Sequence, residues 1–377
     1  MAVLAILAAA LAGAGLARAV AGYLAVRRFA ALPSPAPNPR PVTILKPLHG
    51  AEPMLEQALA TVCAQHFSDF QIVFGVQNFS DPALPVVDRL RARFPQCDIA
   101  VVIDATPHGS NHKVANLINM LPAAKHDILV IADSDVHCAP DYLDRIVAAL
   151  DLPGTGLVTT LYAGLAATPS LDGRLGAAWI NSSFLPGALL ARWLGRQDCL
   201  GATMALRRET LFDIGGLPAL ADHLADDFVL GALVRRQHLS VRLAHTVPAT
   251  TVPEDTLAKL FRHELRWART IRTLVPAQFV LSAVQYPLFW AALAVPLTAA
   301  APWSLGLFLA AWAIRAATAH GIDHALGLAK SGLATPAPIW LLPLRDLMSV
   351  FVILVSHGSN RVEWRGQVLH VAPPRVI

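Results

Sequence analysis

Apolar residues gather at the two ends of the chain, and between them short apolar runs alternate with amphipathic ones. Residues 1–25 are apolar apart from Arg18, and most of the stretch 274–357 is apolar as well. Runs of about 20 apolar residues are long enough to cross a bilayer. The pattern predicts a transmembrane anchor over 1–26, a Pro-rich linker over 27–41, a globular domain over 42–253, an amphipathic interfacial helix over 254–273, transmembrane or interfacial helices over 274–357 and a basic tail over 358–377.

The C-terminal apolar region contains three candidate spans, over residues 275–297, 303–320 and 339–356. Three crossings from a cytoplasmic domain would leave the tail outside, whereas arginines near membrane segments favour the inside. These arginines are Arg361, Arg365 and Arg375. One segment is therefore expected to lie in the interface or to be re-entrant. The first is the weakest span, because it contains prolines at 276, 287 and 296.

The central region alternates strand and helix patterns. Strands are predicted over 42–45, 70–77, 99–103 and 127–132, and helices over 53–65, 111–120 and 141–150, with a further helix opened by Asp81-Pro82. This alternation predicts an α/β fold with a doubly wound, mostly parallel sheet.

Two carboxylates follow the fourth predicted strand directly, in Ala132-Asp133-Ser134-Asp135. Ligands bind at the carboxyl ends of strands in such sheets. Asp133 and Asp135 are suited to share one hard divalent cation with diphosphate oxygens and water. Acidic residues also fill surface turns, so this pair alone leaves both interpretations open. No GxGxxG follows the first strand and the chain contains no GxxxxGK[ST], which disfavours dinucleotide and P-loop sites.

Composition supports a membrane protein. The chain has 377 residues, of which 55% are hydrophobic and 15% charged, and its mean hydropathy is +0.49. The net charge of +4 is better explained by anionic lipid headgroups than by nucleic acid, since much of it lies beside apolar segments. The first segment lacks a basic leader and a convincing cleavage site, and Arg27-Arg28 follow it, so the globular domain is expected in the cytoplasm. The four cysteines form no CxxC pair and are expected to be buried and reduced.

Several candidate functional segments lie downstream. Residues 171–194, with Trp179, Phe184 and Trp193, are either a core helix or the border of a lipid-facing groove. Gly201 indicates a close approach of the backbone to a ligand or a neighbour. Asp226 and Asp227 open an apolar helix, either as structural helix N-terminal acids or as a general base for a hydroxyl nucleophile.

The helix predicted before the C-terminal apolar region is basic and amphipathic. Arg262, Arg266 and Arg269 share one of its faces. These arginines either anchor the helix at the membrane surface, or Arg266 binds diphosphate beside a stacking Trp267.

These segments together resemble the inverting GT-A glycosyltransferases, and within them the ceramide glucosyltransferase family. The resemblance runs in order through residues 44–50, 76–82, 109–117, Asp133-Ser134-Asp135, 201–216, Asp226-Asp227 and Arg266-Trp267. It implies a GT-A catalytic domain flanked by transmembrane helices. Because the composition is alanine-rich and lysine-poor, it is typical of bacteria and favours the hopanoid-associated branch.

The resemblance also implies roles for residues. Asp133 and Asp135 would hold Mg²⁺ or Mn²⁺ with the UDP diphosphate, and Asp227, beside Asp226, would be the base. Substrate binding falls to Lys46 and Pro47 of the first block, Asn78 at the uracil, Lys113 at phosphate or ribose, and Arg266 with Trp267 at diphosphate and acceptor. For Lys113 a solvated loop is the alternative. The family usually has aspartate at Asn78 and Gln or Arg at His263, so this chain departs from the pattern twice.

The implied reaction is inverting transfer from a UDP-sugar, with UDP-N-acetylglucosamine and bacteriohopanetetrol expected, in the bacterial inner membrane with the catalytic domain on the cytoplasmic face. The alternatives are glucosylation of ceramide from UDP-glucose and a nucleotide-binding membrane subunit without catalysis. A transporter is disfavoured, because Arg315 and Asp323 are expected near the ends of spans. Nucleic acid is not an expected partner.

Overall fold

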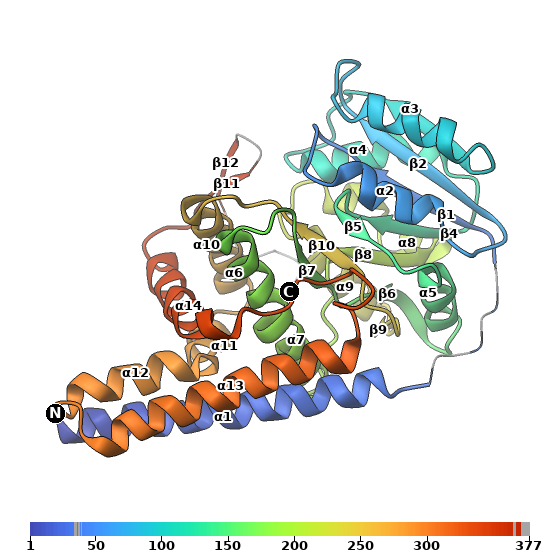
Figure 1. Cartoon of the computed structure of the whole chain (residues 1–377). Coiled ribbons are helices and arrows are strands. Elements are labelled where there is room, and N and C mark those ends of the chain that lie inside the picture. The colour runs from blue at the N-terminus through green and yellow to red at the C-terminus, as the bar shows by residue number, and fades with distance from the viewer. Residues whose placement is uncertain (34–35, 37, 39, 365–366, 371–377) are drawn as a thin grey trace. The chain divides into compact units, whose positions relative to one another are not determined.

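The computed structural model describes residues 1–33, 36, 38, 40–364 and 367–370 (Figure 1). The chain forms two compact units. We call Leu32–Ala163 with Gly195–Thr251 the sheet unit, and Met1–Ala31 with Gly164–Leu194 and Val252–Pro373 the helical unit. The aromatic segment that the sequence placed inside a domain over 42–253 thus groups with the apolar helices. Of the expected tail, Arg365 and Arg375 lie outside the described residues.

A seven-stranded sheet with the order β3-β2-β1-β4-β8-β6-β9 forms the centre of the sheet unit. Its strands are β1 (Val42–Pro47), β2 (Phe70–Val76), β3 (Asp98–Ile103), β4 (Ile128–Ala132), β6 (Thr155–Thr159), β8 (Thr203–Arg207) and β9 (Ser240–Leu243). The first four run parallel to one another, as do β6 and β9, whereas β8 is antiparallel to both of its neighbours. The predicted α/β fold with a mostly parallel sheet is confirmed.

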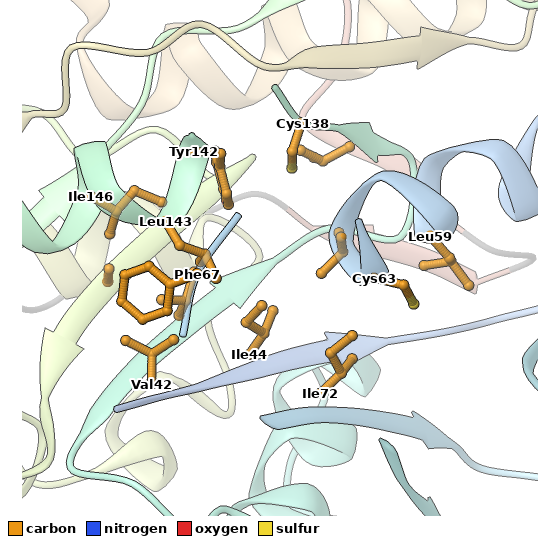
Figure 2. Close-up of a cluster of buried hydrophobic side chains, with 14 of the residues drawn as sticks. Val42, Ile44, Leu59, Cys63, Phe67, Ile72, Cys138, Tyr142, Leu143 and Ile146 are labelled. Carbon is orange, nitrogen blue, oxygen red and sulfur yellow. The ribbon is translucent and has the colours of Figure 1, made fainter. Parts of the chain in front are cut away.

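Helices cover both faces of this sheet, because alternate strand residues point to opposite sides. Ile44 and Ile72 pack against α2 (Leu55–Cys63), α3 (Leu84–Arg93) and α5 (Tyr142–Leu150), as Figure 2 shows for part of this core. Leu45 and Val73 face the opposite core, with α4 (His112–Met120) and α9 (Asp226–Arg236). The two cores hold the strand ends in fixed positions.

Shorter elements complete the sheet unit. They are η1 (Leu121–Ala123), β5 (Val136–His137), α8 (Arg208–Asp213) and η3 (Leu217–Leu220). β5 pairs antiparallel with β10 (Ala249–Val252). Within β10 and within β7 (Ala163–Ala166) the chain passes from one unit to the other. Gly215 and Gly216, which both have positive φ, follow the end of α8.

The helical unit contains three helices that are long and apolar enough to cross a membrane, among the residues searched. These are α1 (Ala2–Ala30), α13 (Pro302–Leu326), and η5 (Ile339–Leu341) continued by α14 (Leu342–Ser356). α1 and α13 lie side by side (Figure 1). Many large apolar side chains on them are exposed, including Ile6, Leu309 and Phe351. Exposed apolar faces of this kind suit contact with lipid.

The first of the three predicted C-terminal spans is a broken helix. α11 (Pro276–Leu281) and η4 (Ser282–Gln285) are followed by α12 (Pro287–Leu297), with a bend of 65° between the two parts. Pro287 lacks an amide hydrogen and disfavours helical geometry at the residue before it. The segment therefore forms a broken span or a re-entrant loop, in agreement with the weakness expected from its prolines.

The remaining elements of the helical unit are α6 (Leu171–Trp179), η2 (Ile180–Phe184), α7 (Leu185–Trp193), α10 (Leu257–Leu274), and the hairpin of β11 (Arg361–Trp364) and β12 (Gln367–His370). η2 is a π-helical turn that joins α6 to α7 without a break. The helix predicted over 254–273 corresponds to α10.

The expectation that Arg315 lies near the end of a span is wrong. α13 continues to Leu326, which places Arg315 in the middle of the helix with 2% of its surface exposed. Its guanidinium donates to the Ser182 carbonyl at 3.0 Å and to Ser183 Oγ at 2.8 Å, and lies 3.7 Å from Asp346 Oδ1. The charge is accommodated because protein groups rather than lipid surround it.

Candidate active site

The predicted acidic pair lies at the carboxyl end of β4. All five residues of this strand are buried, which fixes the position at which the chain leaves the sheet. The amide of Asp133 donates to the Ala202 carbonyl at 3.2 Å, and the amide of Val136 donates to the Asp133 carbonyl at 3.3 Å. The two side chains are only partly buried. A tight turn thus presents both carboxylates at the edge of the sheet where ligands bind in α/β proteins.

Lys113 joins this pair to the second pair of acids. Its Nζ lies 2.7 Å from Asp133 Oδ1 and 3.6 Å from Asp226 Oδ2. The lysine lies in the first turn of α4, and the side chain of Asn111 caps that helix by accepting from the Lys113 and Val114 amides. Burial alone would lower the pKa of Lys113, but the carboxylates of Asp133 and Asp226 outweigh it and raise the pKa. A permanent positive charge therefore lies between the two acidic clusters.

Asp226 and Asp227 form the first turn of α9, as expected. The Asp227 Oδ1 accepts a hydrogen bond of 2.8 Å from the Phe228 amide. Burial, reinforced by the charge of Asp226, raises the pKa of Asp227 to about 7. A carboxylate with a pKa near neutrality is well suited to accept a proton from a hydroxyl.

Gly201 explains why Asp227 has its position. A Cβ at residue 201 would lie 3.0 Å from Asp227 Oδ2. The close approach that the sequence indicates is therefore made to a side chain of the site. A residue larger than glycine at this position would displace the carboxylate.

Two further contacts hold the loop that carries Asp133 and Asp135, the candidate metal ligands. Lys46, fully buried near the end of β1, donates from Nζ to the Asp133 carbonyl at 2.6 Å. Thr250 Oγ1 donates to Asp135 Oδ2 at 2.5 Å. Burial lowers the pKa of Lys46, although the nearby carboxylates act against this. Burial, together with the charge of Asp133, raises the pKa of Asp135 to about 6.

The sequence analysis missed Thr250 and Glu52. Ser134, between the two aspartates, donates to the Glu52 carboxylate, which is contributed by the loop after β1. Glu52 lies shortly after the turn at Gly50, and nothing in its spacing along the sequence distinguishes it from a surface acid. Thr250 lies on β10, far along the chain, and no sequence signal pointed to it.

The donor set fits a divalent cation that is shared with a substrate. Carboxylate oxygens are the ligands that Mg²⁺ and Mn²⁺ prefer. Within the described ranges, no group of three or more His, Cys, Asp or Glu residues is arranged as a complete metal site. The protein thus offers Asp133 and Asp135, and a cation held there would take its other ligands from diphosphate and water.

The remaining predicted residues of the sheet unit have local roles. Asn78 follows β2, where its Oδ1 accepts from the amide and the hydroxyl of Ser80, both at 2.9 Å. Pro47 is the last residue of β1 and lies opposite Gly75. His137, two residues after Asp135, is buried on β5 and bonded to Thr251 Oγ1 at 2.9 Å. Burial, with the charge of Lys46, lowers the pKa of His137 to about 4.

Arg266 and Trp267 lie in the helical unit, on α10. The Trp267 ring packs against Trp179, with centroids 5.4 Å apart, and Trp179 stacks on Phe184 at 5.9 Å. Trp179 Nε1 donates to Tyr286 Oη at 3.2 Å. Two aromatic residues from the segment 171–194 thus join Trp267 in one cluster. The third, Trp193, is half-exposed and lies 5.9 Å from the Arg28 guanidinium.

A buried ion pair fixes α10 within the helical unit. Arg345 on α14 donates from Nη1 and Nη2 to the two carboxylate oxygens of Glu264, at 2.7 and 2.6 Å. Arg345 has no exposed surface. A bidentate pair of this kind fixes orientation as well as distance, so the face of α10 that carries Arg266 and Trp267 is held in place.

The match to known proteins covers nearly the whole chain. The model of the family described as "Glycosyl transferase family 21" matches residues 4–377. Ceramide glucosyltransferase 1 of Caenorhabditis elegans is 21% identical over 272 residues, which are 71% of this chain and 57% of that protein. Ceramide glucosyltransferase of Komagataella phaffii is 35% identical over 125 residues, 32% of this chain and 24% of that protein. The chain therefore spans about half or less of the length of these two relatives.

Among solved structures, a mannosyltransferase from Pyrobaculum calidifontis in complex with GDP-Man and Mn²⁺ has a similar fold. Its TM-score is 0.52 at 22% identity, and the alignment covers 93% of this chain and 99% of that one. This similarity agrees with a GT-A fold. The family match over residues 4–377 shows that the chain belongs to glycosyl transferase family 21.

Proposed function

We propose that this protein is a membrane-bound inverting glycosyltransferase that moves a sugar from a UDP-sugar to the hydroxyl of a membrane lipid. One observation carries the proposal. Lys113 lies between Asp133, of the candidate metal pair, and Asp226, beside the candidate base Asp227. Groups suited to bind a diphosphate and to deprotonate a hydroxyl are therefore adjacent in one unit of the protein.

On the donor side, Asp133 and Asp135 would hold Mg²⁺ or Mn²⁺ together with the UDP diphosphate. A bound cation there would neutralise the charge that grows on the leaving diphosphate. Lys46 donates to the backbone carbonyl of Asp133 and so holds this turn in place. Lys113 supplies a positive charge next to the Asp133 carboxylate. Asn78 follows β2 and Pro47 ends the neighbouring β1, so both lie at the same edge of the sheet, where they would contact the donor. The mannosyltransferase of similar fold from Pyrobaculum calidifontis was described in complex with GDP-Man and Mn²⁺, which supports this arrangement.

On the acceptor side, Asp227 would take the proton of the attacking hydroxyl. The hydroxyl oxygen forms the new bond to the anomeric carbon while the bond from that carbon to the UDP oxygen breaks. Attack from the side opposite the leaving group inverts the configuration, and no covalent intermediate with the protein is needed. Arg266 would balance the diphosphate charge, and Trp267 would pack against a substrate ring.

The lipid acceptor is proposed because several apolar helices have exposed apolar faces. An acceptor with a long or polycyclic tail stays in the bilayer while its polar head reaches the catalytic groups. Arg27 and Arg28 at the end of α1 support a cytoplasmic position for the sheet unit and, with the composition, the bacterial inner membrane.

Two pairs of substrates are candidates. The resemblance to the hopanoid-associated branch, which the alanine-rich, lysine-poor composition favours, implies transfer of N-acetylglucosamine from UDP-N-acetylglucosamine to bacteriohopanetetrol. The names of the curated relatives favour the alternative, transfer of glucose from UDP-glucose to ceramide.

The test is transfer by the purified full-length protein in detergent with Mg²⁺ or Mn²⁺, offering each UDP-sugar against each lipid. We expect one pairing to give a product that Asp227→Asn abolishes while UDP binding persists. Asp213→Asn, which changes an exposed carboxylate on α8, serves as the matched control and should leave turnover unchanged. Retention of turnover in Asp227→Asn would overturn the assignment of the base. UDP binding without turnover in every pairing would favour a non-catalytic subunit.

A further inference from the structure

His263 carries a hydrogen-bonding nitrogen that the proposed reaction has not used. The residue lies on α10, one turn before Trp267, and its Nδ1 bonds to a carboxylate oxygen of Glu254. An ionised carboxylate only accepts hydrogen bonds, so in the neutral form of the ring Nδ1 is the nitrogen that carries the proton. Glu254 is itself buried, which restricts the positions that its carboxylate can take.

The same bond determines the chemistry of the other ring nitrogen. When Nδ1 carries the proton of a neutral imidazole, Nε2 carries a lone pair and accepts hydrogen bonds. This Nε2 is screened from solvent, and within the described part of the chain no protein group forms a hydrogen bond with it. Buried polar atoms normally have a partner, so an acceptor left open at this position indicates a ligand.

The surroundings of the ring hold it in one orientation. The Trp267 ring meets His263 edge to face, with centroids 4.3 Å apart and an interplanar angle of 70°. The next residue, Glu264, is held by the bidentate pair with Arg345. The backbone, the ring plane and the tautomer of His263 are therefore each fixed by a different neighbour.

We propose that Glu254 is a positioning residue that acts through His263, and that the Nε2 of His263 accepts a hydrogen bond from a substrate hydroxyl group. The inference rests on the proposed glycosyl transfer, in which both substrates carry hydroxyl groups. The hydroxyl belongs either to the sugar of the donor or to the polar head of the lipid acceptor. A neutral imidazole acceptor next to Trp267 suits such a group, because the ring of a sugar or a polyol presents hydroxyls beside an apolar face.

A double-mutant cycle in the full-length protein tests the proposal. The variants are Glu254→Gln, His263→Gln and the double variant, with steady-state kinetics for both substrates. His263→Gln keeps an acceptor oxygen near the position of Nε2 but no longer depends on Glu254. We expect Glu254→Gln to raise one KM about three- to tenfold, the range for one net hydrogen bond, with a smaller change in kcat. In the His263→Gln background the same substitution should have no further effect.

The outcome of the cycle decides the role of Glu254. A KM change confined to the lipid acceptor assigns the hydroxyl to the acceptor, and one confined to the UDP-sugar assigns it to the donor. An equal effect of Glu254→Gln in both backgrounds would mean a purely structural role and would overturn the proposal, as would unchanged KM values. Asp255→Asn is the matched control, because Asp255 is the exposed neighbour of Glu254 and forms an ion pair of 2.7 Å with Lys259.

The tautomer can be observed without activity. In protein labelled with ¹⁵N-histidine, the His263 signals can be assigned by their loss in His263→Gln, although the chain has 14 histidines. We expect a protonated Nδ1 and an unprotonated Nε2, and a change of both shifts in Glu254→Gln. A protonated Nε2 in the unmodified neutral ring would contradict the proposal. Since this readout does not depend on turnover, it separates failure of the dyad from failure of the proposed function, which Asp227→Asn tests.

Discussion

The Nζ of Lys113 lies 2.7 Å from Asp133 Oδ1 and 3.6 Å from Asp226 Oδ2. One buried positive charge thus links the end of β4 to the start of α9, two elements that are distant in sequence. Because it stabilises carboxylates on both sides, it opposes the effect of burial, which favours their protonated forms. The donor and acceptor sides of the proposed site are therefore electrostatically coupled.

Removal of this charge should alter both sides of the site. We expect Lys113→Met to weaken UDP-sugar binding and to raise the pKa of Asp227, since Lys113 lowers that pKa in the intact protein. The rising limb of the pH profile of kcat/KM would move to higher pH, whereas Lys113→Arg would move it less. An unchanged profile in Lys113→Met would show that the lysine does not act on the base.

The pH profile of the intact protein follows from the pKa of Asp227, which is about 7. A general base acts only when deprotonated, so kcat/KM should increase as the pH rises through 7 and then level off. Asp226→Asn removes the charge that, after burial, raises the pKa of Asp227 most. The limb should consequently move to lower pH in this variant, in the direction opposite to Lys113→Met. Measuring kcat/KM from pH 5 to 9 for the three proteins checks the sign of both shifts.

Gly201→Ala should impair catalysis more than folding. The new methyl group would lie 3.0 Å from Asp227 Oδ2 and would displace the carboxylate. The carboxylate would have to give by a few tenths of an ångström, so the loss of rate should be smaller than the roughly 10²-fold loss that a misplacement of about 1 Å at a catalytic group can cause. We expect kcat to fall while the KM of the UDP-sugar changes little. Gly306→Ala is a control, because a Cβ there would meet nothing within 4 Å. Equal kcat values in the two variants would contradict the packing argument.

The Glu264–Arg345 pair should contribute strongly to the stability of the helical unit. Loss of one partner of a buried ion pair costs roughly 3–5 kcal/mol, because the other charge is left without compensation. Glu264→Gln should therefore lower the thermal unfolding midpoint in detergent by several degrees. Asp255→Asn, which removes an exposed pair with Lys259, should change it little. Similar midpoints in both variants would show that the buried pair is dispensable.

Chelation of divalent cations should abolish UDP-sugar binding, and addition of Mg²⁺ or Mn²⁺ should restore it. Asp135→Asn should raise the cation concentration needed for half-maximal binding, because one of the two carboxylates at the end of β4 loses its charge. Calorimetry with UDP at varied cation concentrations measures both effects. Full UDP binding in the presence of chelator would remove the basis for a cation at Asp133 and Asp135.

The periodic parts of the chain could be predicted closely from sequence. Each of the first four parallel strands is a short apolar run, so its end, and with it Asp133, could be located before the structure was known. The contacts that complete the site could not. Thr250 and Glu52 each approach the acidic loop from another segment, and only the tertiary fold brings them there. Asp226 and Asp227 are ordinary helix N-terminal acids by pattern, and burial beside Gly201 is what distinguishes Asp227.

The misplacement of Arg315 has a different physical cause. The apolar region is interrupted by three polar residues, His320, Asp323 and His324. For this reason the span predicted from the sequence ends at residue 320. In the structure α13 continues to Leu326 and ends at Gly327, which has a φ of +65°. A glycine directly after the last helical residue is a common signal for a helix end. Gly327 is such a signal, and a helix that extends to it places Arg315 in its middle.

The surroundings of Arg315 bear on how the protein is made. Its partners Ser182 and Ser183 are synthesised before α13, whereas Asp346 on α14 follows later. An arginine at the centre of a membrane helix costs about 2.5–3.5 kcal/mol on insertion scales when nothing compensates it. During translation, α13 would enter the bilayer with only the serine contacts available, and its charge partner would arrive with the next helix. For α13 as a membrane span, we therefore expect stable insertion to require the completed chain and a product truncated before α14 to insert less stably.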